Sequence, residues 1–169
     1  MAYAAEDKTY LVDIHLHGAE NYDTRTRRQD DILHIAKLHG ELGTSFILPT
    51  IYPAPVDEMR AHMDAVKRAT SAQREGAKII GVHLEGPFLN HDRAGSLNRH
   101  GFIEPSVEAL KRLVDGFEDI IRVITIAPEL PRALDVIEAC REYGFLVQMG
   151  HSDATYEQAE DGKRAGAGG

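Results

Sequence analysis

Cysteine is nearly absent from this 169-residue sequence, which has only Cys140 and so cannot form an internal disulfide bond. This usage is typical of proteins in a reducing compartment, and we expect a cytoplasmic location. Cys140 lies in "DVIEACREYG" at helical spacing from Ala133 and Ile137. That spacing predicts a small core residue rather than a nucleophile.

Long apolar runs and basic runs are also missing. No stretch approaches the ~20 apolar residues of a membrane span, and the N-terminus lacks the pattern of a signal peptide. Lys and Arg total 19 against 27 Asp and Glu, a net charge of -8. We therefore expect neither a membrane nor a nucleic acid as partner. With 43% hydrophobic residues, the chain should be globular.

What the sequence contains is a repeated alternation of strand-like and helix-like segments. The predicted strands are 10–18, 44–50, 78–86, 120–129 and 145–152. The predicted helices are 30–43, with Ile32, Ile35, Ala36 and Leu42 on one side, then 56–70, 106–117 and 131–144, and a further helix starts after residue 153. Because the strands are apolar at nearly every position, we expect a parallel sheet covered on both faces.

Two α/β architectures fit this alternation: an open doubly wound sheet, or part of a (β/α)8 TIM-type barrel with about five βα units. No G-x-G-x-x-G follows the first strand, so the dinucleotide-binding version of the open sheet loses its main support. No low-complexity linker interrupts the chain, and residues 1–169 are predicted to form a single domain.

Polar residues that can bind a metal fall at the carboxyl ends of the predicted strands. They are His15, His17, His83, Glu85, Glu129 and His151. Side chains alternate along a strand, so His15 and His17 should project to one side, about 7 Å apart. Imidazoles with a carboxylate suit Zn²⁺ or Fe²⁺, and also Co²⁺ or Mn²⁺. Such an ion lowers the pKa of a bound water to near neutrality, which makes it a nucleophile.

The remaining histidines have simpler interpretations. His34, His39 and His62 lie within helical patterns and are predicted to be surface or boundary residues. His91 and His100 lie in the polar loop of residues 86–104 and are interpreted as exposed. Asp13 and Asp153 flank candidate ligands, and two roles stay open for them: they orient imidazoles as hydrogen-bond acceptors, or they cap turns.

Five stretches resemble one known family. "DIHLHG", "GTSFILPT", "GVHLEGPFLN", "TIAPE" and "GHSDATYEQA" occur between residues 13 and 159 in the order found in the N-acetylglucosamine-6-phosphate deacetylases of the amidohydrolase superfamily. "HLEGPF" followed by "GHSDAT" is highly specific, whereas His-x-His alone fits many metallohydrolases. The resemblance implies a barrel and a divalent metal, Zn or Fe in the first place.

The resemblance also implies roles for individual residues. Glu85 matches the principal carboxylate ligand and His151 a ligand from the fifth strand. His15 and His17 match the pair that binds a second metal in some members. Ser96, in "DRAGSLN", lies where the family contacts substrate, and Leu97 replaces a histidine found there in some members.

The chain departs from the family in length. A barrel needs eight strands and typically about 250 residues, and five strands are predicted here. The family's catalytic Asp, a carbonyl-polarising histidine, a phosphate-binding arginine and the flanking β-sandwich have no counterpart in residues 1–169. We therefore expect an incomplete chain, the N-terminal part of a barrel whose catalytic Asp lies beyond the C-terminus.

The sequence favours a metal-dependent hydrolase that deacetylates N-acetylglucosamine-6-phosphate in amino-sugar catabolism. The alternative is a non-catalytic metal-binding partial barrel or assembly fragment, forming a homodimer or completed by another chain because its sheet edges are open. A relative of the cyclic amidases is disfavoured, because these often carry a carboxylated lysine where this chain has Glu85.

Overall fold

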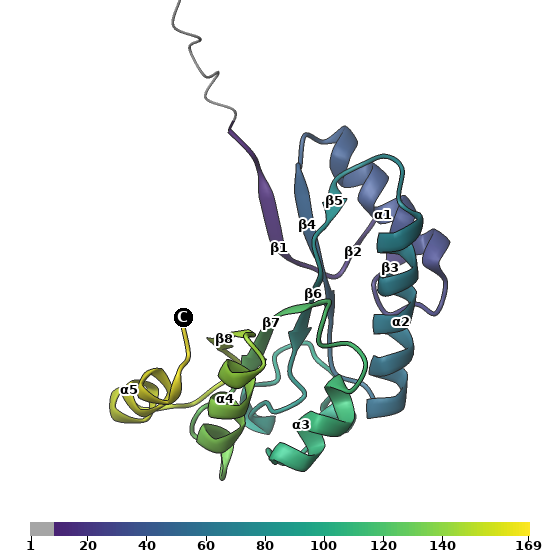
Figure 1. Cartoon of the computed structure of the whole chain (residues 1–169). Coiled ribbons are helices and arrows are strands. Elements are labelled where there is room, and N and C mark those ends of the chain that lie inside the picture. The colour runs from purple at the N-terminus through teal and green to yellow at the C-terminus, as the bar shows by residue number, and fades with distance from the viewer. Residues whose placement is uncertain (1–8) are drawn as a thin grey trace, which may run out of the picture.

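The computed structural model describes residues 9–169 and shows strands alternating with helices along the chain (Figure 1). The strands are β1 (Val12–Leu16), β2 (Gly18–Ala19), β3 (Tyr22–Asp23), β4 (Phe46–Ile51), β5 (Lys78–Ile79), β6 (Val82–Glu85), β7 (Ile121–Ile126) and β8 (Leu146–Met149). The helices are α1 (Gln29–Glu41), α2 (Val56–Ala72), α3 (Val107–Val114), α4 (Ala133–Glu142) and α5 (Tyr156–Ala165), with 3₁₀ turns at His91–Arg93 and Arg99–Gly101.

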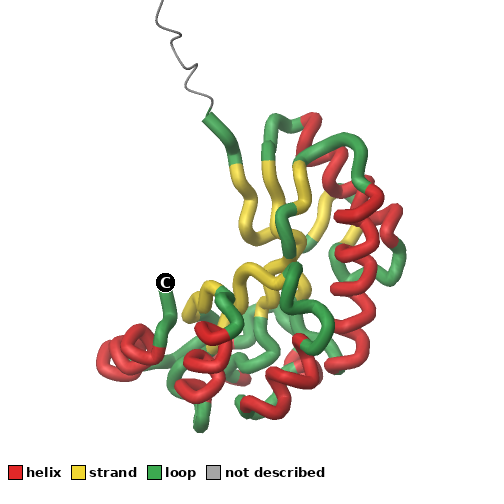
Figure 2. The backbone as a smooth tube through the Cα atoms, in the orientation of Figure 1, coloured by secondary structure: helices red, strands yellow, loops and turns green. Residues whose placement is uncertain are grey.

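The main sheet is parallel, and its strands follow one another in chain order. β1, β4, β6, β7 and β8 are neighbours in that sequence, and β5 pairs with β4. A doubly wound sheet reverses its order at a switch point, whereas each barrel strand lies beside the next one. The sheet curls, with α1, α2, α3 and α4 on its outer side (Figures 1 and 2). The prediction of a partial TIM-type barrel is therefore confirmed, as a parallel half-barrel of five βα units.

The predicted strand 78–86 is divided into β5 and β6 at Gly81. Gly81 has φ +143°, and a Cβ at this position would lie 2.4 Å from the carbonyl oxygen of Ile120. The same carbonyl accepts a hydrogen bond from the amide of Val82 at 2.8 Å. After this glycine the chain pairs with β7 as well as with β4, and β6 ends with Glu85 at the carboxyl edge of the sheet.

The core lies between the sheet and the outer helices. α1 contributes Ile32 and Ile35 and α2 contributes Met59 and Met63, all fully buried. Each such side chain stabilises the fold by roughly 1.5–3 kcal/mol. Cys140 is buried in the same core, as predicted, and burial raises the pKa of its thiol to about 12.

Two expectations about burial were wrong. Leu42 was placed on the apolar side of the first helix, but α1 ends at Glu41 and Leu42 is 83% exposed. The sheet was expected to be covered on both faces, yet Val12 on β1 and Leu146 on β8 are 49% and 48% exposed. These are the two edge strands, where the curled sheet does not close on itself within the described residues.

His62 was predicted to be a surface or boundary residue, but it is 5% exposed on the inner side of α2. Burial lowers the pKa of its imidazole, with a further lowering contribution from the charge of Arg25. Within residues 9–169 its Nδ1 is buried without a hydrogen-bond partner.

Among residues 9–169, the helices are too short or too polar to cross a membrane.

Candidate metal centre

The C-terminal ends of three strands bring candidate ligands to one edge of the sheet. His15 lies within β1 and His17 directly follows it, Glu85 is the last residue of β6, and His151 lies two residues beyond β8. Parallel strands end at a common edge, which is where α/β barrels carry their active sites. A local irregularity sets the end of β1: the register with β4 shifts between Asp13 and Leu16.

At that irregularity Leu16 faces Pro49, so β4 has no N–H to donate to β1 there. The amide of Leu16 donates to Oγ1 of buried Thr50 at 3.0 Å, and the amide of His15 donates to Asp13 at 3.0 Å. Asp13 thus accepts from a backbone amide within β1, and among residues 9–169 no hydrogen bond joins it to an imidazole. Irregularities of this kind re-aim side chains at strand ends.

Three side chains converge at this edge. Their possible ligand atoms, from His15, His17 and Glu85, all lie within 4.8 Å of one another. The Nε2 atoms of His15 and His17 are 3.1 Å apart, as expected for side chains on one side of a strand. Nε2 of His17 lies 3.0 Å from Oε2 of Glu85, and Nε2 of His15 lies 3.6 Å from Oε1.

His151 approaches the same carboxylate from the β8 end. Its Nε2 lies 2.9 Å from Oε1 of Glu85, and its Nδ1 lies 2.9 Å from the carbonyl oxygen of Arg93. Because a carbonyl oxygen only accepts, Nδ1 of His151 is the donor to Arg93, and Nε2 is the ring atom that faces Oε1 of Glu85. His151 has φ +50°, and its own carbonyl accepts from the amide of Asn90 at 3.0 Å.

The donor set fits a divalent cation. Glu85 is 5% exposed, and its Oε2 is buried without a hydrogen-bond partner among residues 9–169. A buried carboxylate oxygen with no donor is costly, and two imidazole nitrogens at 3.1 Å need a proton or a cation between them. One ion near Nε2 of His15 and His17 and Oε2 of Glu85 would satisfy all three atoms. Imidazole and carboxylate ligands suit Zn²⁺, Fe²⁺, Co²⁺ or Mn²⁺.

His83 lies next to this cluster but is engaged elsewhere. It is buried, its Nδ1 donates to the carbonyl of Ile14 at 2.8 Å, and its Nε2 lies 2.8 Å from Oγ1 of Thr125. Burial lowers the pKa of the ring, although the hydrogen bond to Ile14 acts in the opposite direction. Its ring meets that of His15 edge-on, with centroids 4.9 Å apart. His83 therefore packs against the ring of His15 and limits its movement.

Glu129 also lies at a strand end but serves as a hydrogen-bond hub. Burial acts to raise its pKa, yet hydrogen bonds donated by Ser152, Asn90 and the amide of Asp153 hold that pKa below its usual value. These bonds join the ends of β7 and β8 to the loop after β6. Asp153 pairs with Arg93 rather than with His151. Backbone carbonyls, not aspartates, therefore orient the imidazoles of His83 and His151.

The loop after β6 passes over His151. A Cβ at Gly95 would lie 3.9 Å from Cε1 of His151, and the next residue, Ser96, is exposed. Leu97 packs against the small apolar cluster of Leu89, Ala94 and Phe102. Ser96 is thus near the candidate centre, while the side chain of Leu97 is half-buried in its own loop. His91 and His100 are exposed, as expected.

A cavity of about 380 Å³ adjoins the cluster. Its lining residues are His15, Glu85, Thr125, Gln148, Met149, Gly150, His151 and Gly169. Gly169 reaches it because the amide of Gly168 donates to Val147 at 2.9 Å and the amide of Met149 donates to Gly169, both on β8. The candidate ligands thus border a space that a small molecule can enter.

Three further residues near the centre were missed by the sequence analysis: Asp23, Arg25 and Tyr52. The ring of Tyr52 stacks on that of His17, with centroids 4.5 Å apart and planes 6° apart. Burial and the hydrogen bond to Asp23 raise the pKa of Tyr52 to about 12. Tyr52 directly follows β4, so its position at a strand end was the signal that pointed to it.

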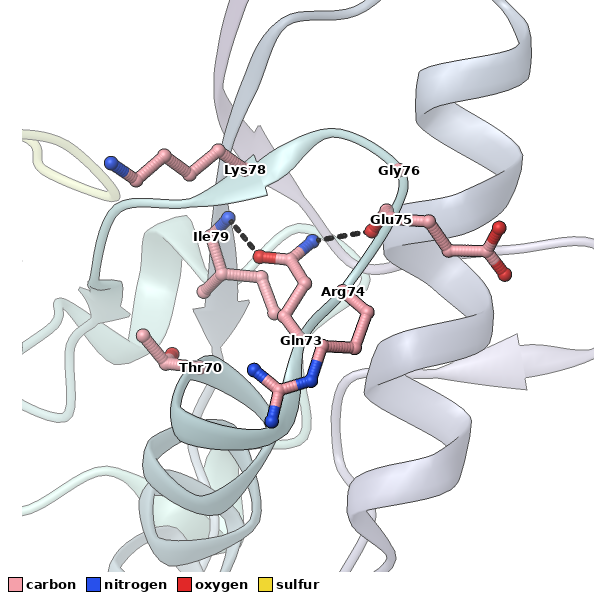
Figure 3. Close-up of a pocket in the computed structure, with 7 residues that line it drawn as sticks. All are labelled: Thr70, Gln73, Arg74, Glu75, Gly76, Lys78 and Ile79. Atoms are coloured by element: carbon pink, nitrogen blue, oxygen red, sulfur yellow. Dashed lines mark hydrogen bonds between the residues drawn. The ribbon is translucent and has the colours of Figure 1, made fainter.

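A second cavity, of about 310 Å³, lies at the opposite end of the strands, between the end of α2 and β5 (Figure 3). There the side chain of Gln73 accepts from the amide of Ile79 at 3.1 Å and donates to the carbonyl of Glu75 at 3.0 Å. These bonds hold a turn together. In barrels this end of the sheet is the one associated with stability rather than catalysis.

Parallel strands in chain order, outer helices and a His–His–Glu cluster at the carboxyl edge define the class: part of a TIM-type barrel with a candidate metal centre.

No protein-family model matches the chain. Individual proteins do match. The N-acetylglucosamine-6-phosphate deacetylase of Vibrio furnissii is 32% identical over 93% of this chain and 39% of its own length. The N-acetylgalactosamine-6-phosphate deacetylase of Escherichia coli O157:H7 is 28% identical over 94% of this chain and 42% of its own length.

Among solved structures, N-acetyl-D-glucosamine-6-phosphate deacetylase from Mycobacterium smegmatis, a mutant in complex with N-acetyl-D-glucosamine-6-phosphate, superposes with a TM-score of 0.86. It is 29% identical, over 94% of this chain and 40% of that one. The chain is thus similar, over nearly all its length, to N-acetylglucosamine-6-phosphate deacetylases, which confirms the resemblance of its motifs. It spans about 39% of the length of the Vibrio relative.

Proposed function

We propose that this chain carries the metal-binding part of an N-acetylglucosamine-6-phosphate deacetylase, a cytoplasmic amidohydrolase of amino-sugar catabolism. The observation that carries the proposal is the buried carboxylate of Glu85, whose Oε2 lacks a hydrogen-bond donor in residues 9–169 and faces Nε2 of His17. The similarity to deacetylases over most of the chain supports the same reading.

In this proposal His15, His17, Glu85 and His151 hold a divalent metal, Zn or Fe in the first place, with Co and Mn as alternatives. When bound, such an ion supplies an activated water and polarises the amide carbonyl. The chain's residues contribute the geometry. The carbonyl of Arg93 accepts a hydrogen bond from Nδ1 of His151, so Nε2 is the ring atom that would bind the ion. His83 backs the ring of His15.

The substrate is proposed to enter the cavity that His15, Glu85 and His151 border. Ser96 lies on the loop that passes over His151, and we propose that its exposed hydroxyl contacts the amino-sugar phosphate. The side chain of Leu97 packs within that loop, so a contact from this position would come from its backbone. We assign no general acid or base among these residues, and we propose that the family's catalytic Asp is supplied from outside residues 1–169.

The test is acetate release from N-acetylglucosamine-6-phosphate by the metal-loaded chain, compared with Glu85→Ala. We expect any release to disappear in the variant. Equal, measurable rates in the two proteins would reject the role of Glu85. N-Acetylgalactosamine-6-phosphate serves as a second substrate, because one relative bears the name of its deacetylase.

A second candidate function is a non-catalytic metal-binding partial barrel that acts in assembly. The exposed apolar side chains of Val12 and Ile14 on β1 and of Leu146 on β8 favour it. Both strands are edges of the sheet, and unpaired edges bind further strands. The partner would be a second copy of the chain or another polypeptide. Saturable metal binding without acetate release would favour this function over the first.

A further inference from the structure

Tyr52 restricts the imidazole of His17. The two rings are stacked, with centroids 4.5 Å apart and an interplanar angle of 6°. Tyr52 is half-buried and directly follows β4, so its backbone is held by the sheet. An imidazole in this position cannot turn about its Cβ–Cγ bond without losing the stacking contact. Stacked aromatic pairs are stabilised in that arrangement.

Tyr52 is itself held by the hairpin that follows His17. Its hydroxyl donates to Oδ2 of Asp23 at 2.7 Å, and the amide of Arg25 donates to Oδ1 of the same carboxylate at 2.7 Å. The guanidinium of Arg25 lies over the Tyr52 ring, 4.8 Å from its centroid. Asp23 pairs with Gly18 in the β2–β3 hairpin, so the residues after His17 turn back to hold the ring that packs against it.

The backbone of His17 is fixed by the same hairpin. Its carbonyl accepts from the amide of Thr24 at 3.0 Å, and buried Thr24 also donates from Oγ1 to the carbonyl of Thr50 at 2.6 Å. The hairpin is thereby joined to β4 close to Tyr52. Backbone and ring of His17 are held by one continuous set of contacts.

The other imidazoles are oriented differently. Backbone carbonyls accept from Nδ1 of His83 and from Nδ1 of His151. In the described part of the chain, no hydrogen bond reaches Nδ1 of His17. The plane of this ring is therefore set by stacking on Tyr52 together with the contacts of its Nε2 with His15 and Glu85. Metal ligands need such outer contacts, because an ion selects ring orientations in which the nitrogen lone pair points at it.

We propose that Tyr52 and Asp23 form a clamp that fixes the ring plane of His17 and so preorganises the centre for a divalent cation. The clamp rests on the metal centre of the proposed function but not on the deacetylation reaction. Tyr52 and Asp23 are positioning residues, since they act through His17. The clamp is specific to this ligand, because His83 and His151 do not use it.

The test is a titration of the metal-free 169-residue chain with Co²⁺, followed by visible absorption and by competition with a chromophoric chelator. Tyr52→Ala removes the stack, Tyr52→Phe keeps the stack and removes the hydroxyl, and Asp23→Asn weakens the hydrogen bond. Tyr143→Ala is the matched control, because Tyr143 stacks on Phe145 away from the centre, with centroids 5.3 Å apart and planes 12° apart.

We expect Tyr52→Ala to bind Co²⁺ about 10-fold more weakly than the original chain, with a changed band pattern, as is typical for loss of an outer contact. Tyr52→Phe and Asp23→Asn should show smaller losses, and Tyr143→Ala none. An unchanged affinity and spectrum in Tyr52→Ala, or an equal loss in Tyr143→Ala, would overturn the clamp. If Tyr52→Ala does not fold, an unchanged spectrum and affinity in both milder variants overturns it instead.

The same titration separates the clamp from the deacetylase proposal. A chain that binds no Co²⁺ at a saturable site overturns the metal centre and the clamp together. The expected pattern of Co²⁺ affinities, found together with equal and measurable acetate release by the original chain and Glu85→Ala, overturns only the proposed deacetylation at this centre.

Discussion

At the scale of single residues, the centre depends on the environment of one carboxylate. Glu85 is buried at the end of β6, with imidazole nitrogens at 2.9 Å and 3.0 Å from its two oxygens. Oε2 is buried without a hydrogen-bond partner among residues 9–169, and a cation shared with the imidazoles would satisfy it. The arrangement is that of a candidate metal site.

Replacing Glu85 by Gln should weaken binding of Zn²⁺ by about 100-fold or more, because losing a charged ligand costs more than losing an outer contact. Isothermal titration with a competing chelator measures this change. Glu142→Gln, at the exposed end of α4, is the matched control and should bind as the original chain does. Equal affinities in the Glu85 and Glu142 variants would exclude Glu85 as a ligand.

Glu85→Gln should not lower the free energy of unfolding of the metal-free chain. Metal-free Glu85→Gln should be as stable as the original chain or more so, because it removes a buried charge whose Oε2 has no donor among the described residues. Added Zn²⁺ at 100 times the Kd of the original chain should stabilise that chain by about 2.7 kcal/mol and the variant by about 0.4 kcal/mol or less. Urea unfolding with and without Zn²⁺ tests both statements. A large loss of metal-free stability in the variant would contradict them.

His62 gives a pH dependence that is separate from the centre. Its pKa is lowered in the folded chain, chiefly by burial, from an ordinary value of 6.5. The unfolded chain therefore binds more protons between the lowered pKa and 6.5, so the stability from neutral His62 is complete above pH 6.5 and falls as the pH drops below it. We expect His62→Leu to lose less stability than the original chain between pH 7.5 and pH 5.5. The free energy of unfolding in urea is measured for both proteins at each pH. An equal loss of stability in the two proteins between pH 7.5 and pH 5.5 would rule this out.

At the scale of elements, the sequence predicted the longer strands and helices well, because each is long enough for its hydrophobic period to repeat. Val56, Met59 and Met63 recur at helical spacing, and α2 begins at Val56. The β2–β3 hairpin was missed because each strand has two residues, too few for any alternation to be visible. The strand-end rule located His15, His17 and Glu85, but Tyr52 was overlooked because its role arises from a contact with His17 across two strands.

Burial of polar residues was the weaker part of the sequence analysis. His62 follows the apolar spacing of α2, next to buried Met63, but histidine is intermediate in its preference for the interior. Only its packing position decides its burial. The contact of Asp13 with the amide of His15 was likewise not predictable from sequence, because it lies at the register shift between β1 and β4.

Gly81 is the element-scale position where a substitution should cost most. Gly81→Ala would place a Cβ 2.4 Å from the carbonyl oxygen of Ile120 and force an alanine to φ +143°. We expect a loss of about 3 kcal/mol or more, since backbone strain of this kind costs roughly 1–3 kcal/mol before the clash is added. The measurement is the free energy of unfolding in urea.

Gly116→Ala is the control for this experiment. Gly116 has φ +78°, but a Cβ there would meet nothing within 4 Å, so only the conformational cost of about 1–2 kcal/mol applies. The difference between the two variants isolates the steric contact with Ile120. Equal losses would show that β5 and β6 tolerate a side chain at their junction.

At the scale of the whole molecule, the half-barrel has two open edges. β1 and β8 each pair on one side only in the described sheet, and both expose apolar side chains. Gly168 and Gly169 bond to the free side of β8, which covers that edge for a short length only. Open edges with apolar side chains and few charges favour pairing with another strand. We therefore expect the 169-residue chain to self-associate at micromolar concentration.

Introducing lysine at both edges should suppress that association, because a charged side chain on an edge strand resists pairing with a second chain. We expect the double variant Val12→Lys and Leu146→Lys to elute as a monomer where the original chain forms dimers or larger species, by size-exclusion chromatography with light scattering. Leu42→Lys is the control, since Leu42 is 83% exposed but lies after α1 rather than on an edge. If the control dissociates the assembly equally, total charge and not the strand edge governs association. If the original chain is already monomeric, the assembly function loses its support, while metal binding at Glu85 stands on its own test.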